Sequence, residues 1–479
     1  MSAPFSIYKD RDIYFLELDS PGSSVNIFSR AAAEQVHQFI HQLKPDDASL
    51  VVFKSSKPYS FLNGTELVLT ASAHTIADAT ALSQRTRQAY RAIEQCPVPT
   101  VSAIQGSCFG CGVEFALCTD FRLAADSFDT CFYMTELKDY YFPPIFGALE
   151  KLPRLLGLPG AVDFLLWGEK WRAEQARNSN LIDHVLPGED FNSNLRAFLT
   201  SGALRNLKKR PILDLPALES AHDTADRDRI RHRIDRLPEE QRGLYSLCFE
   251  AMLESLQSPY SNEFVRKSAA AFQSVFQSDA WRNATSFFFI RTMARTASLG
   301  TSSMIPSDPV TLRLPATGSE FARILGGRGL KGLTVLSDET VFRPELICKD
   351  AIRHPFDARC GFDKDVRSDA RPLIYFPDGE RDVCEVFITP EALRQFRPLL
   401  VLITHLGWHP IVRRMDGKSV LNTLVEAGAS GLRHVHREAQ TLLRTKVLRH
   451  SSQVDVAVCS LFDFPPSRGS FMSHFAGTS

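Results

Sequence analysis

A glutamate at position 114 lies inside an apolar stretch, just after a glycine-rich turn ("IQGSCFGCGVEFALCTDFRLAAD", residues 104–126). An ionised carboxylate is rarely buried without a partner or a function. A glycine turn that runs into a helix leaves backbone N–H groups unpaired, and such groups can hold an oxyanion. A nearby glutamate can then act as a general acid or base. On these residues alone, a tight strand–helix turn in which Glu114 pairs with Arg122 is equally compatible with the pattern.

The residues before this turn predict alternating strands and helices. Apolar runs at Ile13–Leu18, Leu50–Phe53 and 101–106 predict buried strands. Apolar residues at helical spacing predict helices over Arg30–Leu43 and Thr75–Gln95, between these strands. This order of elements indicates a layered α/β architecture.

Composition excludes several classes of function. Lys+Arg and Asp+Glu both number 55 in 479 residues, so no net charge favours nucleic acid or an anionic membrane. No apolar run is long enough to span a bilayer, and the first residues lack the pattern of a signal peptide. Ten cysteines show no disulfide-scaffold spacing, and one Cys-x-x-Cys pair is weak evidence for a metal. We therefore expect a cytoplasmic protein with reduced thiols and no metal site.

The second half of the chain has its own succession of elements. A charged stretch, Thr224–Arg242, predicts one amphipathic helix, and Leu244–Arg295 has a helical pattern. Ser298–Pro309 has the composition of a loop and predicts a domain boundary. Strands are then expected at Leu333–Leu336 and Leu373–Phe376, followed by helices from Pro390 and from Val420.

Four ordered motifs resemble the crotonase (enoyl-CoA hydratase/isomerase) family. The first is the stretch 104–126, with its strand, glycine turn, glutamate and helix. The second, "CFYMTEL", has Glu136 in place of the second family glutamate, 22 residues after Glu114. An earlier loop, "FLNGTEL", contains Gly64 and Thr65, and a downstream block covers Leu152–Pro187. The resemblance implies the crotonase ββα spiral for residues 1–200.

The resemblance also implies a chemistry and the residues that perform it. The carbonyl of an acyl-CoA or acyl-carrier thioester would accept the N–H groups of Thr65 and Cys111, which form the oxyanion hole. Glu114 and Glu136 would share the proton transfers, as in an enoyl-CoA hydratase/isomerase-like lyase. No cofactor is implied beyond the coenzyme A of the substrate. The implied substrate-binding residues are Gly64, Gly110, Gly112, Tyr140 and Tyr141.

Two departures from the family pattern leave other functions open. Cys111 replaces the middle glycine of a usual triple glycine, which adds a side chain near the substrate. The usual glycine-rich loop after the second glutamate is here "DYYFPPIFGAL", whose prolines and aromatic rings are expected to stiffen and fill the pocket. The alternatives are another crotonase reaction (dehydration, decarboxylation or thioester hydrolysis in a biosynthetic pathway) and an inactive acyl-CoA-binding pseudoenzyme.

Beyond residue 200 the chain resembles, more weakly, the α subunit of the fatty-acid oxidation multienzyme. This resemblance implies a helical linker (201–300), a degenerate Rossmann-like remnant (301–415) and a C-terminal helical remnant of a dehydrogenase (416–479). The strand Leu333–Leu336 is followed by "SDETVF", which lacks the glycines that a dinucleotide requires. The family's catalytic histidine falls on Ile374, although its partner glutamate falls on Glu385. Neither NAD binding nor dehydrogenase activity is expected, and the implied partner is a second copy or a related subunit.

Overall fold

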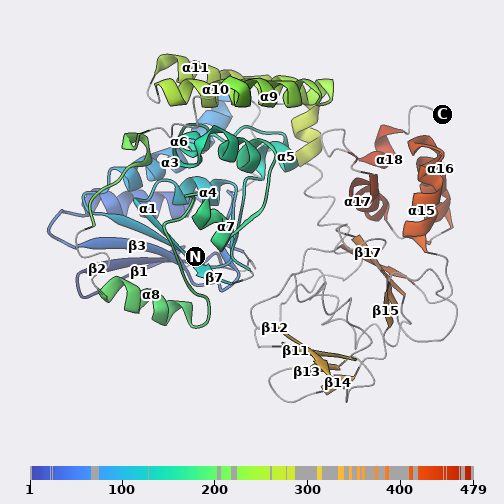
Figure 1. The fold of residues 1–479 in the computed structure, drawn as a ribbon, viewed down its shortest axis with the longest axis horizontal. Helices are drawn as coiled ribbons and strands as arrows, with labels where there is room; N and C mark the ends of the chain where they lie inside the picture. Colours follow the sequence, from blue (N-terminus) through green and yellow to red (C-terminus); the bar gives the residue numbers. More distant parts are fainter. Residues whose placement is uncertain are drawn as a thin grey trace. The chain divides into compact units, whose positions relative to one another are not determined.

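The computed structural model describes most of residues 3–285 and parts of the chain between residues 310 and 475. The chain forms two compact units, Met1–Trp281 and Arg282–Ser479, which are described separately (Figure 1). Within the first unit the residues left out are 22, 24, 66–74, 128, 202–206, 217–223, 259–260 and 277. In the second, the described residues are 282–285, eight strands between 310 and 413, and 419–475 except 446, 449, 463 and 465–469.

Two sheets form the centre of the first unit. The larger has six strands in the order β1-β2-β3-β5-β7-β10, and the smaller has four in the order β4-β6-β8-β9. The strands of the larger sheet are β1 (Phe5–Asp10), β2 (Ile13–Leu18), β3 (Leu50–Ser55), β5 (Thr100–Ile104), β7 (Phe121–Asp126) and β10 (His184–Pro187). Those of the smaller are β4 (Ser60–Asn63), β6 (Ser107–Phe109), β8 (Cys131–Tyr133) and β9 (Trp171–Arg172).

The chain places these strands by repeating one unit of strand, strand and helix. The three repeats are β3-β4-α3, β5-β6-α4 and β7-β8-α5, with α3 at Ile76–Glu94, α4 at Cys111–Ala116 and α5 at Glu136–Tyr140. Each repeat adds one strand to each sheet, parallel to the strand of the repeat before it. Parallel neighbours require a crossover, which the helix of each repeat supplies. The ββα spiral predicted for this part of the chain is confirmed.

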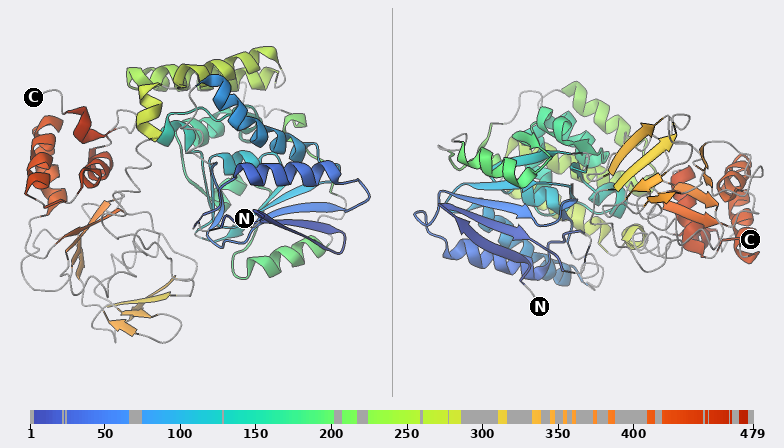
Figure 2. Two further views of the ribbon diagram at one scale, coloured as in Figure 1. Left: turned by 180° about the vertical axis from the view of Figure 1, so that it is seen from behind. Right: turned by 90° about the horizontal axis from the view of Figure 1, so that it is seen from below.

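Helices cover the larger sheet on both faces (Figure 2). On one face lie α1 (Arg30–Gln42) and α3, whose N-terminal caps are Ser29 and Thr75. On the other face α8 (Phe191–Thr200) packs Phe191, Leu195 and Leu199 against the strands.

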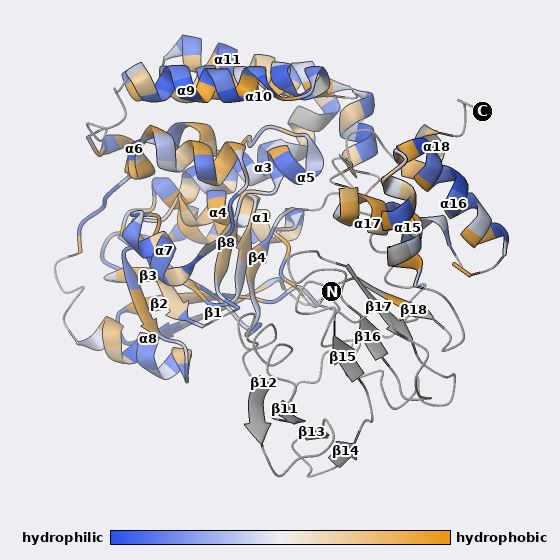
Figure 3. Cartoon of the chain, turned by 45° about the vertical axis from the view of Figure 1, so that its right-hand side comes forward, coloured by the Kyte–Doolittle hydropathy of each residue, from blue (hydrophilic) through white to orange (hydrophobic). Residues whose placement is uncertain are grey.

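A further helical layer packs on α6 (Ala148–Ala161), which continues into a π-helical turn (Val162–Leu166). It consists of α9 (Thr224–Asp235), α10 (Glu239–Gln257) and α11 (Asn262–Val275), while α7 (Ala173–Asn178) lies nearer the sheets. Ser255 of α10 donates its hydroxyl to the Leu149 carbonyl of α6. Figure 3 shows α6 as largely hydrophobic and α9 as largely hydrophilic, in agreement with their burial.

The single helix predicted over Thr224–Arg242 is wrong. The structure has two helices there, because Pro238 stands between them as the N-terminal cap of α10. A proline cannot continue the hydrogen-bond ladder of a preceding helix. In the stretch predicted as helical from Leu244, α10 ends at Gln257 with Ser258 as its cap, and α11 begins at Asn262 with Ser261 as its cap.

The second unit contains eight described strands and four described helices. The strands form two sheets, β12-β11-β13-β14 and β15-β16-β17-β18. Strands predicted at Leu333–Leu336 and Leu373–Phe376 are present as β12 (Leu333–Asp338) and β16 (Leu373–Tyr375). The other bounds are β11 (Val310–Pro315), β13 (Glu345–Ile347), β14 (Arg353–Pro355), β15 (Arg359–Gly361), β17 (Val383–Phe387), β18 (His409–Arg413), α15 (Val420–Gly428), α16 (Leu432–Arg444), α17 (Ser451–Phe462) and α18 (Phe471–His474).

The four C-terminal helices share a hydrophobic core that includes Leu424, Val435 and Val454. The helix predicted from Val420 is confirmed as α15. The helix predicted from Pro390 and the boundary at 298–309 lie outside the described residues. The dehydrogenase-like character of this half and the four domain bounds stay predictions. Across the described parts of the chain, no helix is both long and apolar enough to cross a membrane.

Candidate active site

The register of the smaller sheet places two backbone N–H groups at neighbouring strand ends. β4 and β6 run parallel with Asn63 opposite Phe109, and Thr65 and Cys111 each lie two residues beyond this pair. Thr65 forms a β-bridge with Phe28, whose N–H donates to the Gly64 carbonyl at 2.9 Å. Among described residues, no acceptor is found for the N–H of Thr65 or of Cys111, the first residue of α4. The role of these two N–H groups as oxyanion-hole donors stays a prediction.

Two glycines allow the close packing at the start of α4. Gly110 has φ +55°, and a Cβ there would lie 2.6 Å from Glu136 Oε1. A Cβ on Gly112 would lie 2.0 Å from the Leu62 carbonyl oxygen of β4. The first glycine thus makes room for a carboxyl group and the second for a strand. A side chain at either position would move α4 away from its neighbours.

Glu114 is held by the backbone at the beginning of α6. Its side chain is buried, and its Oε1 accepts the N–H of Phe146 at 2.8 Å and of Ala148 at 3.1 Å. A carboxylate at a helix N-terminus is favoured by the helix dipole. The pairing of Glu114 with Arg122, considered from the sequence, is wrong, because Arg122 instead contacts Asp183 at 3.2 Å.

Glu136 is the first residue of α5 and has the less satisfied carboxyl group. Its Oε2 is enclosed and lacks a hydrogen-bond partner among the described residues. Burial, and then the charge of Glu114, raise the pKa of Glu136 to about 8. Burial raises the pKa of Glu114 to about 7, while the N–H groups of Ala148 and Phe146 and the charges of Lys151 and Arg87 oppose that rise. The two protons belong to one coupled pair, in which Glu114 is the more readily ionised carboxyl.

This arrangement predicts that Glu136 destabilises the fold at alkaline pH. The pKa of Glu136 is raised above its unfolded value, so its contribution is most favourable below pH 4 and is lost as the pH rises toward 8. Relative to native protein, Glu136→Gln should therefore gain about 2 to 4 kcal/mol of unfolding free energy between pH 4 and pH 8.5. Urea unfolding at a series of pH values measures this difference. A difference in unfolding free energy between the two proteins that stays constant with pH would contradict the ionisation of a buried Glu136.

The loop after Glu136 is anchored on the outer helical layer. Tyr141 ends α5 with φ +51° and is buried. The Phe142 ring packs 5.5 Å from the ring of Phe272 in α11 and 6.0 Å from Trp281. The ring of Phe142, one of the three aromatic rings expected to fill the pocket, thus packs on helical residues that lie much later in the sequence. The roles of Tyr140 and Tyr141 in binding substrate stay predictions.

Three groups at the site were not identified from the sequence. The Tyr90 hydroxyl of α3 donates to the Cys111 carbonyl at 2.7 Å, which fixes the first turn of α4. The N–H groups of Phe146 and Ala148 hold Glu114, and Lys151 lies close to that backbone. Backbone N–H donors cannot be recognised from a sequence, because every residue type except proline carries one. The buried lysine could have been recognised, because Lys151 occupies a position on the apolar face of α6.

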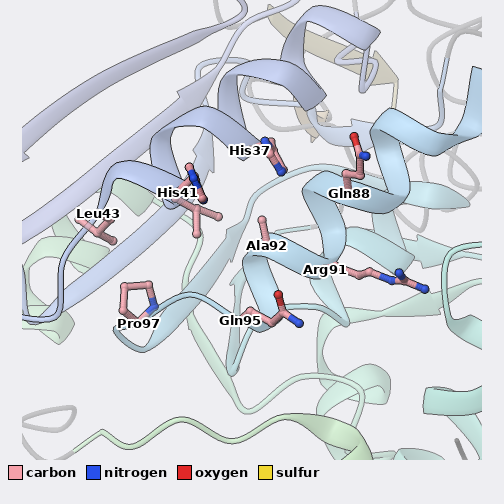
Figure 4. A pocket seen from close by; sticks show the side chains of 9 residues that line it. His37, His41, Leu43, Gln88, Arg91, Ala92, Gln95 and Pro97 are labelled. Atoms are coloured by element: carbon pink, nitrogen blue, oxygen red, sulfur yellow. The ribbon is translucent and has the colours of Figure 1, made fainter.

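A separate groove with a volume of about 430 Å³ lies between α1 and α3 (Figure 4). It is lined by His37, Ile40, His41, Leu43, Gln88, Arg91, Ala92, Gln95 and Pro97, and none of the predicted site residues is among them. Within the described part of the chain, no group of three or more His, Cys, Asp or Glu side chains is placed to hold a metal ion.

The first half of the chain is similar in sequence to known proteins. Residues 9–237 match the family model described as enoyl-CoA hydratase/isomerase. Two relatives named fatty acid oxidation complex subunit alpha, from Aliivibrio fischeri and Idiomarina loihiensis, are 32% identical over 180 residues, which is 37% of this chain. The matched segment spans 26% and 25% of those proteins, so the chain covers about a quarter of their length.

Solved structures are also similar to this chain. Pseudomonas aeruginosa DspI is 23% identical with a TM-score of 0.40, and the match covers 49% of this chain and 97% of that protein. An enoyl-CoA hydratase from Bacillus halodurans is 17% identical with a TM-score of 0.39, and the match covers 56% of this chain and 99% of that protein.

Proposed function

We propose that residues 9–237, which match the enoyl-CoA hydratase/isomerase (crotonase) family model, bind an acyl thioester and transfer protons on it through Glu114 and Glu136. The observation that carries this proposal is the pair of enclosed carboxyl groups beside the glycine turn, which differ in how readily they ionise. Two carboxyl groups with separated pKa values supply one base and one acid near neutral pH. The thiol component of this thioester belongs to coenzyme A or to an acyl carrier.

The N–H groups of Thr65 and Cys111 receive the thioester carbonyl in this proposal. When a nucleophile adds to the β-carbon of a 2-enoyl thioester, negative charge moves onto that carbonyl oxygen. Preorganised N–H donors stabilise the resulting enolate more than the ground state. Their location at the ends of two parallel strands keeps their spacing rigid.

In the proposed hydration reaction, each glutamate performs one proton transfer. Ionised Glu114 accepts a proton from water as the water oxygen bonds to the β-carbon. Neutral Glu136 then donates its proton to the α-carbon of the enolate, and the net reaction adds water across the double bond. The hydrogen bonds from Phe146 and Ala148 occupy Glu114 Oε1, which leaves Oε2 to accept the proton. The steps require no metal and no nicotinamide cofactor.

The decisive experiment follows the absorbance of the conjugated thioester in short-chain and medium-chain 2-enoyl-CoA. Purified full-length protein should remove this absorbance catalytically. Glu174→Gln is the control, because Glu174 is exposed and pairs with the exposed Arg177 on α7. A flat trace for native protein with every enoyl-CoA tested would contradict hydration.

Glu114→Gln should lower kcat about 100-fold and change KM little. The amide oxygen can still accept the two backbone N–H groups, so the geometry persists while the base is lost. Steady-state kinetics on the same substrates measures both constants. Unchanged kcat in this variant would exclude Glu114 as the base.

A second candidate function is binding of an acyl thioester without turnover. It is favoured by the two hydrogen bonds to Glu114, which also suit a purely structural carboxylate at the N-terminus of α6. In that case native protein and Glu114→Gln bind a non-reactive acyl-CoA equally, and neither removes the enoyl absorbance. Isothermal titration of the two proteins separates this candidate from catalysis.

The role of the second unit is also a proposal. We infer that it binds no NAD, because β12 ends in Ser337 and Asp338 and is followed by "ETVF" rather than by the glycines of a dinucleotide-binding turn. The carboxylates of Asp338 and Glu339 in this segment would repel a pyrophosphate. Association with a second copy or a related subunit is the role that we assign to it.

A further inference from the structure

A buried lysine lies against the backbone that holds Glu114. Lys151 is the fourth residue of α6, and its side chain is 4% exposed. A Cβ on Gly147 would lie 2.9 Å from the Lys151 Nζ, so the ammonium packs directly against this glycine. Gly147 stands between Phe146 and Ala148, whose N–H groups donate to Glu114. The ammonium is therefore in contact with the segment that fixes the carboxylate.

A second path joins Lys151 to the same glutamate. Its Nζ donates to Cys118 Sγ at 3.3 Å, and that thiol donates to the Glu114 carbonyl oxygen at 3.2 Å. On the other side Nζ forms an ion pair with Glu94 at the end of α3. Lys151 thus connects α3, α4 and α6 around Glu114.

The charged and titratable groups near Glu114 come from four helices and the turn after α4. These groups are Arg87, Tyr90, Arg91 and Glu94 of α3, Cys111 of α4, Cys118 of the turn, Glu136 of α5, and Glu150 and Lys151 of α6. Burial lowers the pKa of Lys151, but Cys118 and Glu94 raise it further, and the net direction is upward. The lysine therefore stays a cation across the range in which Glu114 titrates. Lys151 and Arg87 are the cations that oppose the effect of burial on Glu114.

We propose that Lys151 is a positioning residue, whose buried ammonium keeps Glu114 ionised and fixes the 146–148 backbone on its carboxylate. The importance of Lys151 for turnover rests on the proposed function of Glu114 as the base. The effect of Lys151 on the ionisation of Glu114 is independent of that function, because the contacts between them exist in the protein without substrate.

The test titrates Glu114 directly by NMR of full-length protein labelled with ¹³C at the glutamate side-chain carboxyl. The Glu114 signal is assigned as the one missing in Glu114→Gln. Lys151→Met removes the cation and should raise the Glu114 midpoint by about 1 to 2 pH units. Glu94→Gln removes the anion that neutralises Lys151 and should lower the midpoint by about 0.5 to 1 unit.

Shifts of opposite sign support the proposal, because repacking of the 146–148 segment alone would not reverse sign between the two variants. Unchanged midpoints, or shifts in the same direction, would overturn it. With an active enzyme, the acid limb of the pH–kcat profile should move with each midpoint. If native protein turns over no thioester while the midpoints still move oppositely, the proposed function fails and the role of Lys151 stands.

Discussion

Glu136→Gln is expected to lower kcat about 10³-fold or more on a 2-enoyl-CoA, without weakening acyl-CoA binding. Glu136 is proposed to deliver the proton to the α-carbon, and a glutamine cannot supply that proton. Its carboxyl packs against Gly110 at the glycine turn, so an isosteric amide should leave the shape of the site unchanged. Single-turnover absorbance measurements, combined with titration of a non-reactive acyl-CoA, separate the chemical step from binding.

The same variant should be more stable than native protein at alkaline pH, because it no longer carries an ionisable group with a raised pKa. A variant that loses activity but gains stability at alkaline pH has lost a catalytic group and does not have a folding defect. Exchange of the α-hydrogen with solvent gives a further check, since it requires the acid and base but not net hydration. Native-like turnover by Glu136→Gln would remove Glu136 from the mechanism.

Gly112→Ala is expected to lower the free energy of unfolding by about 2 to 4 kcal/mol and to abolish most activity. The new methyl group would lie 2.0 Å from the Leu62 carbonyl oxygen, which belongs to backbone and cannot rotate away. The start of α4 must therefore move relative to β4. That movement displaces the Cys111 N–H from Thr65, and a displacement of about 1 Å at such a site costs about 100-fold in rate.

Gly243→Ala provides the matched control for this substitution. Gly243 lies within α10, and a Cβ there would meet no atom within 4 Å. Because alanine favours helix more than glycine does, this variant should gain up to about 1 kcal/mol. Thermal and urea unfolding of both variants measure the contrast. Equal stability changes at the two sites would show that α4 and β4 are not packed as closely as described.

Much of the first unit could be predicted from local pattern. Apolar runs and helical stripes identified β2, β3, α1 and α3, because each of these elements buries one face within a short stretch of sequence. The ββα spiral was implied by the resemblance of the motifs around Glu114 and Glu136 to the crotonase family, and in it each repeat adds neighbouring parallel strands to the two sheets. Local pattern was misleading over Thr224–Arg242, where the charged stretch read as one helix extends past the break at Pro238.

The sequence by itself determined which chemical groups are available: two glutamates, a glycine turn that permits close backbone approach, and two loops that follow parallel strands. Only the tertiary structure decided how those groups are held. Glu114 is bound by N–H groups 32 and 34 residues later in the chain, and Phe142 packs on Phe272 of a distant helix. The order in which Glu114 and Glu136 ionise also depends on burial and on Lys151. Burial and through-space charge arise from packing between elements far apart in sequence, and no local pattern records them.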